Sequence, residues 1–474
     1  MEGAGCMTIN EAYGFIDKAA GYGSILGLET MTNLLKGLDN PQDKLKFVHI
    51  AGTNGKGSTA AFITHILAAA GLRVGRYISP SVFSYEEKIQ ITCEETVSRE
   101  TCENTSHQLK SNEFGNCGTN AQLADNFSSE RKIKTEYIKE VDIASLIEKI
   151  QYVCEALVSC GKSHPTVFEV ETAMAMLYFV QEKCDIVVLE VGLGGKLDAT
   201  NVIKTTECGV ITSISMDHME YLGDTLEKIA IQKAGIIKDG IQVAAYDLKE
   251  EAMKVIEETS KKMGADLRKA DFYKIKNLNM TLNQTSFDYK ERKNIVIKLP
   301  GINQVYNAVV AILTADALNE RGYVISETAI LKGLSSTTWR GRFEVIKNEP
   351  LFIIDGAHNT DAALSLAENI KIYLKDKKIR FIMGVLKDKD YDEILNVIKG
   401  VGEKIYTVSP NNSRALSSGI LAEKALEKGI PAVDAVSVQG AVTMALSESA
   451  TSDVIIAFGS LSYLGEVVNI VNWS

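Results

Sequence analysis

The chain has 474 residues, of which 45% are hydrophobic and 24% are charged, and its net charge is −10. This length predicts two or three domains, because a single domain typically holds about 100–200 residues. The negative charge argues against nucleic acid or an anionic membrane as the main partner. No apolar run approaches the roughly 20 residues that a membrane span needs.

The N-terminal sequence MEGAGCMTINEAYGF contains no basic segment followed by an apolar one, so we expect no secretory signal and a cytoplasmic location. None of the eight cysteines forms a C-x-x-C pair. Free thiols in a reducing compartment are therefore expected, rather than a zinc site or a disulfide framework.

Short β-branched runs alternate with helical patterns in the first part of the chain. Runs of this kind suit strands that are buried on both faces of a parallel sheet, and the alternation predicts right-handed βαβ units in a three-layer α/β domain. The predicted strands are Phe47–Ala51, Val74–Ile78, Asp185–Glu190, Gly209–Ser215 and Gln242–Tyr246, and the predicted helices are Ser58–Ala70, Thr172–Gln181 and Thr225–Ile237.

A second α/β set follows Pro300. Between the two sets, Asp271–Leu299 alternates in polarity and predicts a small antiparallel unit. We place the domain boundary near Leu299–Gly301, which gives an N-terminal domain of residues 1–299 and a smaller C-terminal domain of residues 300–474. The strands predicted in the second domain are Leu351–Asp355, Ile379–Val385, Lys404–Ser409 and Asp453–Phe458.

The segment Cys93–Lys134 interrupts this pattern, because it is rich in Ser, Thr, Asn, Glu and Lys and poor in aromatic residues. Such a composition cannot bury enough apolar surface to offset the entropy of ordering. We expect a solvated insertion or mobile loop of unknown role. Its His107, Cys102 and Cys117 have a spacing that fits no usual metal pattern.

The stretch FVHIAGTNGKGSTAAFITHILAAAGL joins a strand to an apolar helix through a turn with three glycines and a lysine. Glycines allow several backbone N–H groups to point at one anion, and the N-terminus of the following helix adds partial positive charge. Lys56 adds a full charge, although the spacing differs from the common G-x-x-x-x-G-K-[ST] motif. This turn predicts a phosphate site made by Thr53, Asn54, Gly55, Lys56, Gly57 and Ser58.

Three candidate metal ligands lie at the end of a predicted strand of the first domain or after it. They are Ser79, Glu190 and His218. Ligands collect beyond the carboxyl ends of strands in a doubly wound sheet, which is also the edge where Lys56 lies. The oxygens of Ser79 and Glu190 suit Mg²⁺, whereas a histidine is a less usual ligand for it.

Seven segments, taken in chain order, resemble the motifs of the folylpolyglutamate synthase and dihydrofolate synthase family of ATP-dependent Mur-type ligases. They are GTNGKGS, PTVFEVETA, LEVGLGGKLDATN, SISMDHMEYLGDTLEKIAIQKAGIIK, NQVYNA, WRGRFEVI and DGAHN. The resemblance implies an N-terminal P-loop parallel-sheet ATPase domain followed by a Rossmann-like α/β domain. It implies a monomer that uses ATP, Mg²⁺, L-glutamate and a folate or dihydropteroate, and it leaves a monovalent cation as an open question.

The resemblance also implies a reaction and a role for individual residues. ATP would phosphorylate a folate or pteroate carboxylate, and the amine of glutamate would then displace phosphate. Lys56, His218 and Lys233 would be catalytic, with Lys233 carbamylated. Asn307, Arg342 and Asp355 would contact ATP, His358 and Ser460 would lie near glutamate, and the pterin site would be lined by Thr166, Val167, Phe168, Glu169, Leu197, Asp198 and Ala199.

The chain departs from the family pattern at two positions. Ser81 replaces the usual His after Ser-Pro, which bears on substrate contacts, and Gln232 replaces the usual Glu before the carbamylated lysine. The motifs leave open whether the ligase makes dihydrofolate, extends a polyglutamate tail, or does both, and to what tail length. A peptidoglycan-precursor ligase of the Mur type and a catalytically silent nucleotide-binding protein are the alternatives.

Overall fold

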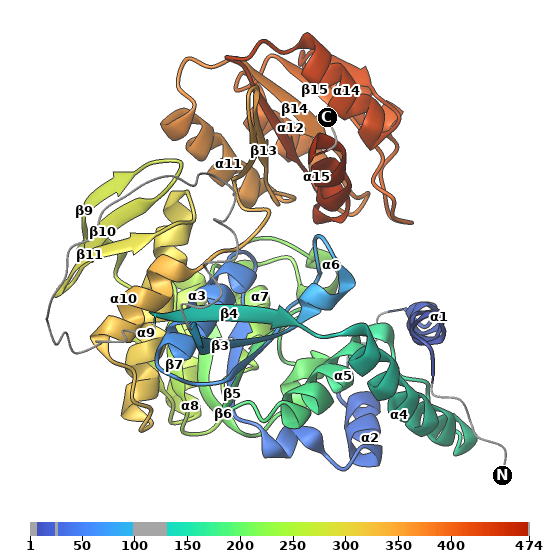
Figure 1. Ribbon diagram of the computed structural model, residues 1–474, viewed down its shortest axis with the longest axis vertical. Coiled ribbons are helices and arrows are strands. Elements are labelled where there is room, and N and C mark those ends of the chain that lie inside the picture. Colours follow the sequence, from blue (N-terminus) through green and yellow to red (C-terminus); the bar gives the residue numbers. More distant parts are fainter. Residues whose placement is uncertain (1–6, 24–26, 98–129, 473–474) are drawn as a thin grey trace, which may run out of the picture.

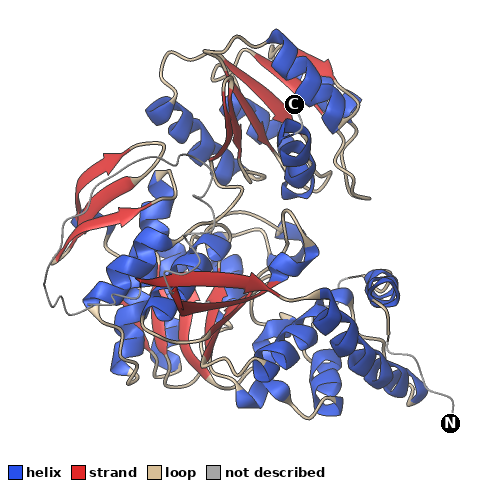
Figure 2. Cartoon of the chain, viewed as in Figure 1, coloured by secondary structure: helices blue, strands red, loops and turns tan. Residues whose placement is uncertain are grey.

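The computed structural model describes residues 7–23, 27–97 and 130–472. The described chain forms two α/β domains, with a small antiparallel sheet beside the first of them (Figure 1). Both domains have helices on the two faces of a central sheet, as Figure 2 shows, so the predicted fold class is confirmed.

The N-terminal domain is built on an eight-stranded sheet with the order β4-β3-β2-β5-β1-β6-β7-β8. The strands from β2 to β8 in this order run parallel, and β3 near one edge runs antiparallel to both of its neighbours, β2 and β4. Every residue of β1 and β5 is buried, as expected for strands covered on both faces. The strands are β1 Phe47–Ala51, β2 Val74–Tyr77, β3 Ile89–Val97, β4 Glu130–Tyr137, β5 Ile186–Glu190, β6 Thr206–Ile211, β7 Gln242–Ala245 and β8 Asp266–Lys269.

Two groups of helices cover this sheet. One face carries α3, α9 and α10, and the other carries α1, α2, α4 and α5 together with α7 and α8. The helices are α1 Ile9–Ala20, α2 Glu29–Gly37, α3 Lys56–Ala69, α4 Glu140–Ser159, α5 Val167–Gln181, α6 Met219–Leu222, α7 Leu226–Ala234, α8 Glu250–Lys262, α9 Ile302–Glu320 and α10 Glu327–Ser336.

The central helix α3 is buried along nearly its whole length, because α9 and α10 pack on the side that the sheet leaves free. Gly333 of α10 permits this close packing, since a Cβ there would lie 2.4 Å from the Cα of Ile66. The predicted domain boundary near Leu299–Gly301 is therefore wrong. The apolar face of α9 completes the core of the first domain, and the chain leaves that domain only after Ser336.

The predicted antiparallel unit is confirmed as a three-stranded sheet of β9 Ile275–Met280, β10 Thr285–Tyr289 and β11 Arg292–Ile297. The prediction of a loop over Cys93–Lys134 is wrong at both ends, because Cys93 pairs with Lys134 in the β3–β4 ladder. Its middle, with His107, Cys102 and Cys117, lies outside the described residues.

The C-terminal domain has a six-stranded sheet in the order β12-β13-β17-β14-β15-β16, in which only β12 is antiparallel to its neighbour. Helices α11, α12 and α13 cover one face, and α14 and α15 cover the other. The strands are β12 Glu344–Asn348, β13 Leu351–Ile354, β14 Ile379–Met383, β15 Lys404–Thr407, β16 Ala432–Asp434 and β17 Val454–Phe458, and the helices are α11 Thr360–Tyr373, α12 Tyr391–Ile398, α13 Ser418–Glu427, α14 Val438–Glu448 and α15 Leu464–Asn472.

The two domains touch through the loop that follows β2. Val82 and Phe83 of this loop pack against the apolar cluster beneath α14 and α15, and the Arg340 guanidinium lies 3.8 Å from the centre of the Phe83 ring. The N-terminal domain thus places one of its loops on the core of the C-terminal domain, close to Ser79 in the chain.

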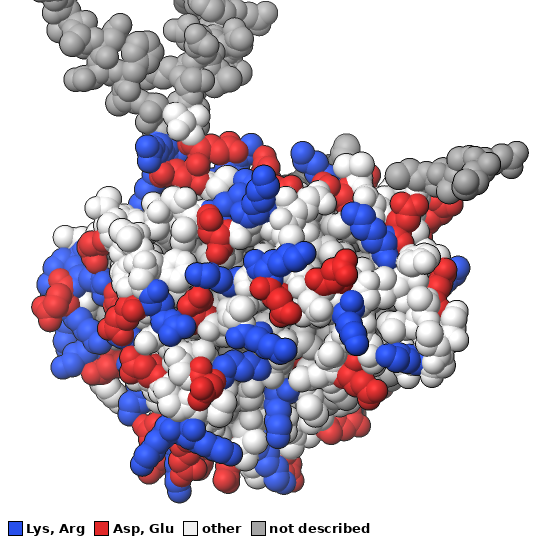
Figure 3. Space-filling model, turned by 90° about the horizontal axis from the view of Figure 1, so that it is seen from below, with Lys and Arg blue, Asp and Glu red and all other residues white. Residues whose placement is uncertain are grey.

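Three further findings concern the cysteines, membrane-spanning helices and the distribution of charge. The five cysteines that lie in the described part of the chain are all free. Among the described residues there is no helix that could cross a membrane. On the face seen in Figure 3, acidic and basic side chains are interspersed, so the negative net charge does not gather into one patch there.

Candidate active site

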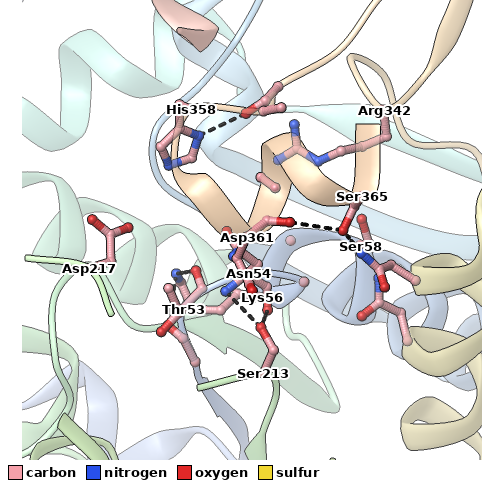
Figure 4. Close-up of a pocket in the computed structure, with 18 of the residues that line it drawn as sticks. Thr53, Asn54, Lys56, Ser58, Ser213, Asp217, Arg342, His358, Asp361 and Ser365 are labelled. Atoms are coloured by element: carbon pink, nitrogen blue, oxygen red, sulfur yellow. Dashed lines mark hydrogen bonds between the residues drawn. The ribbon is translucent and has the colours of Figure 1, made fainter. Parts of the chain in front are cut away.

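A cavity of about 480 Å³ opens where the carboxyl ends of the first sheet face the C-terminal domain. The N-terminal domain lines it with residues 52–58 and with the loops after β2, β5 and β6. The C-terminal domain adds Arg342, Asp355 and His358, and Figure 4 shows Arg342 and His358 across from Thr53, Asn54 and Lys56. The cavity therefore collects polar groups from two domains.

The glycine turn between β1 and α3 is held rigidly by the loop after β6. The backbone N–H of Thr53 donates to the Ser213 carbonyl (2.7 Å), and the Thr212 hydroxyl donates to the Asn54 carbonyl (2.8 Å). Gly55 has φ +86°, a left-handed conformation that favours glycine. No side chain caps the N-terminus of α3, so its first N–H groups are free to bind an anion. All six predicted phosphate-binding residues line the cavity.

Two lysines lie directly beneath this turn. Lys56 Nζ donates to the carbonyl oxygens of Gly52 and Thr53, both at 3.2 Å, and Lys233 Nζ donates to the Gly52 carbonyl at 2.7 Å. Lys233 is only 3% exposed. Burial, and then the neighbouring Lys56 charge, lower the pKa of Lys233 to about 7. Near neutral pH, a large fraction of Lys233 is therefore an uncharged amine, which is a nucleophile.

The predicted metal ligands Ser79, Glu190 and His218 all line the cavity. Burial raises the pKa of Glu190 to about 7, although Lys56 and Arg342 act in the opposite direction. A buried carboxylate of this kind would be stabilised as an anion by a dication. His218 is in the left-handed region (φ 51°) at the start of α6, and its backbone N–H donates to the Asp217 carboxylate.

Among the described residues, no group of three or more His, Cys, Asp or Glu side chains is arranged to hold a metal. A complete protein cage is not what Mg²⁺ requires, because it usually binds through one or two carboxylates and the phosphates of a nucleotide. The donor set of Glu190 and Ser79 beside the phosphate turn fits a Mg²⁺ that arrives with a nucleotide.

Arg342 and Asp355 reach the cavity from the start of the C-terminal domain. The Asp355 carboxylate accepts hydrogen bonds from the backbone N–H groups of Phe343 and Ala357, both at 2.8 Å, so Asp355 fixes the loops on either side of it. The Arg342 guanidinium lies where a Cβ on residue 356 would be, 2.0 Å from it, and only Gly356 leaves that space free. Burial lowers the pKa of Arg342, while Asp355 and Glu190 oppose that shift.

Asn307 of α9 lies against the glycine turn. Its amide oxygen accepts hydrogen bonds from the hydroxyls of Thr59 (3.3 Å) and Tyr246, and a Cβ on Gly55 would lie 2.5 Å from it. Asn307, Arg342 and Asp355, the three predicted ATP contacts outside the turn, all line the cavity. His358 also lines it, and burial lowers the pKa of His358 to about 4.

The predicted pterin residues are not among those that line the cavity. Thr166 and Glu169 form a capping box at the start of α5, and the Asp198 carboxylate accepts hydrogen bonds from Leu193 and Thr200. Their polar groups hold the local fold, while Leu197 is 41% exposed. Val167, Phe168 and Ala199 pack against the apolar cluster beneath α5, and their role in substrate binding stays a prediction.

Ser460, predicted to lie near glutamate, is not in the lining of the cavity either. It is 5% exposed, and its hydroxyl lies 2.8 Å from that of Ser462. Its neighbour Leu461 does line the cavity.

Several residues of the site were not predicted. The indole of Trp339 lies against Gly57, 3.0 Å from where a Cβ would be, and the buried Arg76 guanidinium lies 4.9 Å from the centre of its ring. Asn359 and Asp217 bridge the two domains. Trp339, Asn359 and Asp217 stand inside the quoted motifs WRGRFEVI, DGAHN and SISMDHMEYLG, but a motif does not show which residue its side chain contacts.

Comparisons with known proteins show which proteins the two domains resemble. Residues 135–315 match a model of the Mur ligase middle domain, and residues 341–461 match a Mur ligase glutamate ligase domain. The chain is 32% identical, over 82% of each chain, to a dihydrofolate synthase/folylpolyglutamate synthase of Bacillus subtilis, and 31% identical, over 81% of each chain, to a folylpolyglutamate synthase of Lacticaseibacillus casei.

Solved structures show the same likeness. A folylpolyglutamate synthase of Thermotoga maritima superposes with a TM-score of 0.76 at 30% identity, covering 98% of this chain and 97% of that one. The Escherichia coli FolC protein, in complex with DHPP and ADP, superposes with a TM-score of 0.76 at 26% identity, covering 98% of each chain.

Proposed function

Because the chain belongs to the dihydrofolate synthase/folylpolyglutamate synthase family of Mur ligases, we propose that its interdomain cavity joins L-glutamate to a folate or pteroate carboxylate and releases ADP and phosphate. The protein is an ATP-dependent ligase. One observation carries the assignment to this cavity: the glycine turn with Lys56 and the guanidinium of Arg342, from different domains, line the same space.

The nucleotide triphosphate would lie on the free N–H groups at the start of α3, with Lys56 and Arg342 balancing its charge. Both cations now contact backbone carbonyls, at Gly52 and Thr53 for Lys56 and at Gly341 for Arg342. They are thus held close to the turn before any phosphate arrives. Such preorganised positive charge stabilises a transferring phosphoryl group.

Mg²⁺ would be held by Glu190 and Ser79, with His218 as a third donor. When bound, it would supply charge neutralisation for the phosphoryl transfer. The chain itself contributes the buried Glu190 carboxylate. Burial disfavours its charged form, so a bound cation would stabilise it.

Lys233 would carry a carbamate. Its neutral amine would attack CO₂, forming an N–C bond and releasing one proton, so that an uncharged buried group would become an anion beside Lys56. This is supported by the two lysines that share the Gly52 carbonyl as an acceptor; within the described part of the chain, neither lysine forms an ion pair with a carboxylate. The residue before Lys233 in α7 is Gln232, which carries no charge. The carbamate would therefore add a negative charge that residue 232 does not supply.

The chemistry follows from the weakness of a carboxylate as an electrophile. Phosphorylation would convert one of its oxygens into a leaving group, and the amine of glutamate would then attack the acyl phosphate. An acyl phosphate hydrolyses readily, so the second domain would serve to exclude water as well as to add Arg342. We also propose that the protein acts as a monomer in the cytoplasm.

The test is ADP release by the purified protein with ATP, Mg²⁺ and glutamate, given either dihydropteroate or tetrahydrofolate. Product with dihydropteroate alone assigns dihydrofolate synthesis, product with tetrahydrofolate alone assigns tail extension, and product with both assigns a bifunctional enzyme. A muramoyl-peptide precursor is the negative control. Release of ADP with that precursor only would overturn the folate assignment.

A further inference from the structure

A connected set of four polar side chains crosses the domain interface next to the cavity. Asn54 and Asp217 belong to the N-terminal domain, and Asn359 and Lys389 belong to the C-terminal domain. We propose that Asp217 and Lys389 are positioning residues for the ligase reaction: they align the His218 loop and the phosphate turn with the C-terminal domain. The proposal rests on the proposed function for its kinetic part.

The ion pair is the strongest contact of this set. Lys389 Nζ donates to Asp217 Oδ1 at 2.8 Å, and the side chains are only 7% and 10% exposed. The same oxygen accepts the backbone N–H of His218 at 2.9 Å. A charge in the C-terminal domain therefore acts through one carboxylate on the backbone of a candidate metal ligand. A buried carboxylate without its partner would be left uncompensated, so the pair has to form in this arrangement of the domains.

The second contact joins the other Asp217 oxygen to the phosphate turn. Asn359 Nδ2 donates to Asp217 Oδ2 and to Asn54 Oδ1, both at 3.1 Å, while Asn54 Nδ2 donates back to Asn359 Oδ1 at 3.3 Å. Asn359 also caps α11, because its Oδ1 accepts from the N–H of Ala362. The start of α11 is thereby placed against the turn that carries Lys56. Figure 4 shows Asn54 and Asp217 on separate segments of the N-terminal domain.

These contacts differ in kind from the apolar contact that the loop after β2 makes with the C-terminal domain. Val82 and Phe83 pack on the C-terminal domain through apolar contacts and through the Arg340 guanidinium that lies over the Phe83 ring. Apolar packing supplies association but tolerates sliding, whereas charged and amide hydrogen bonds fix relative position. We therefore expect loss of the ion pair to let the C-terminal domain tilt away from the phosphate turn, which misplaces the reacting groups, while the contact of Val82 and Phe83 keeps the domains together.

The kinetic test compares Lys389→Met and Lys389→Arg with the parent enzyme. We expect Lys389→Met to lower kcat by roughly 10²-fold, as small misplacements do, and to raise KM for ATP by no more than the factor of about ten expected when Arg342 alone is displaced. Lys389→Arg keeps the charge and should restore most of kcat. The matched control is Arg380→Met, which removes the Arg380–Asp453 pair (2.7 Å) inside the C-terminal domain, away from the interface. An equal loss in that control, or an unchanged kcat in Lys389→Met, would overturn the proposal.

A double-mutant cycle tests whether Asp217 and Lys389 act as one unit. In an Asp217→Asn background, the further change Lys389→Met should alter kcat less than about twofold. Additive losses would mean that the two residues act separately, and would reject the pair as a unit.

A scattering measurement separates this proposal from the proposed function. With ADP present, small-angle X-ray scattering should give a larger radius of gyration for Lys389→Met than for the parent and for Arg380→Met. If the parent lacks ligase activity but this difference is found, the proposed function fails and the alignment of the domains stands. If the radii are the same in an active parent, the alignment fails and the function stands.

Discussion

The ammonium groups of Lys56 and Lys233 converge on one acceptor, the carbonyl oxygen of Gly52, at 3.2 and 2.7 Å. Burial is the main reason that the pKa of Lys233 falls to about 7. Repulsion from the nearby Lys56 charge is the second reason. The two side chains place positive charge directly beneath the phosphate turn.

Lys56→Ala should lower kcat/KM for ATP by about 10²–10³-fold, because one preorganised charge beside the phosphates is lost. Steady-state ADP release measures it. The control is Lys261→Ala, which removes an exposed lysine of α8 and should leave the rate unchanged. A parent-like rate in Lys56→Ala would contradict the assignment of the turn.

Lys233 should carry a carbamate whose occupancy rises with pH through about 7, because only the neutral amine reacts with CO₂. ¹³C NMR of the protein in labelled bicarbonate should show a carbamate resonance that is absent from Lys233→Ala. That variant should lose activity and regain part of it in acetate, which supplies the missing carboxylate. A resonance that persists in Lys233→Ala would place the carbamate elsewhere.

Gly356→Ala should displace the Arg342 guanidinium, since the new methyl group would lie 2.0 Å from Nη1. We expect KM for ATP to rise about tenfold, which corresponds to the loss of one charge-assisted hydrogen bond. Gly14→Ala on α1 meets nothing within 4 Å and is the matched control. An unchanged KM in Gly356→Ala would show that Arg342 does not reach the nucleotide.

The stability of the protein should fall as the pH drops below about 6.5. Burial lowers the pKa of His49 to about 3 and that of His65 to about 4. At a pH between these values and the ordinary pKa of histidine, the unfolded chain therefore binds protons that the folded chain does not bind. Each histidine then contributes up to about 1.4 kcal/mol of lost stability per pH unit between its unfolded and folded pKa values.

Thermal midpoints between pH 7.5 and pH 5 should test this, with His49→Asn giving a shallower decline than the parent. Thr200→Val is the control, because it removes the hydroxyl that lies 2.8 Å from His49 Nε2 but leaves the imidazole buried. It should lower the midpoint at every pH and keep the slope. A parent-like slope in His49→Asn would assign the pH dependence to other groups.

The fold could be predicted in outline because its signals are local. A β-branched run such as Phe47–Ala51 predicts a strand of a parallel sheet by its composition alone. The glycine turn that follows it predicts the start of a helix. The boundary near Pro300 was mistaken because a proline or glycine break marks the start of a helix as readily as the end of a domain. Which core α9 joins depends on its packing against α3, and that contact is not local.

The candidate site divides in the same way. The strand ends and the glycine turn led from sequence to Lys56, Glu190 and His218, since residues at the carboxyl ends of parallel strands share one edge. The residues of the pterin site were predicted from motifs alone. In the structure, the polar groups of Thr166 and Glu169 cap the N-terminus of α5. A motif identifies which residues are special without distinguishing a structural hydrogen bond from a contact with substrate.

The sequence by itself determined the α/β class, the phosphate turn and the family, because these depend on composition, on spacing along the chain and on motif order. Only the tertiary structure decided that Lys233 is buried beside Lys56, that Arg342 occupies the space above Gly356, and that Lys389 pairs with Asp217 across the domains. The reason is physical: burial and charge pairing depend on distances between atoms that are far apart in the chain, and these distances exist only once both cores have packed.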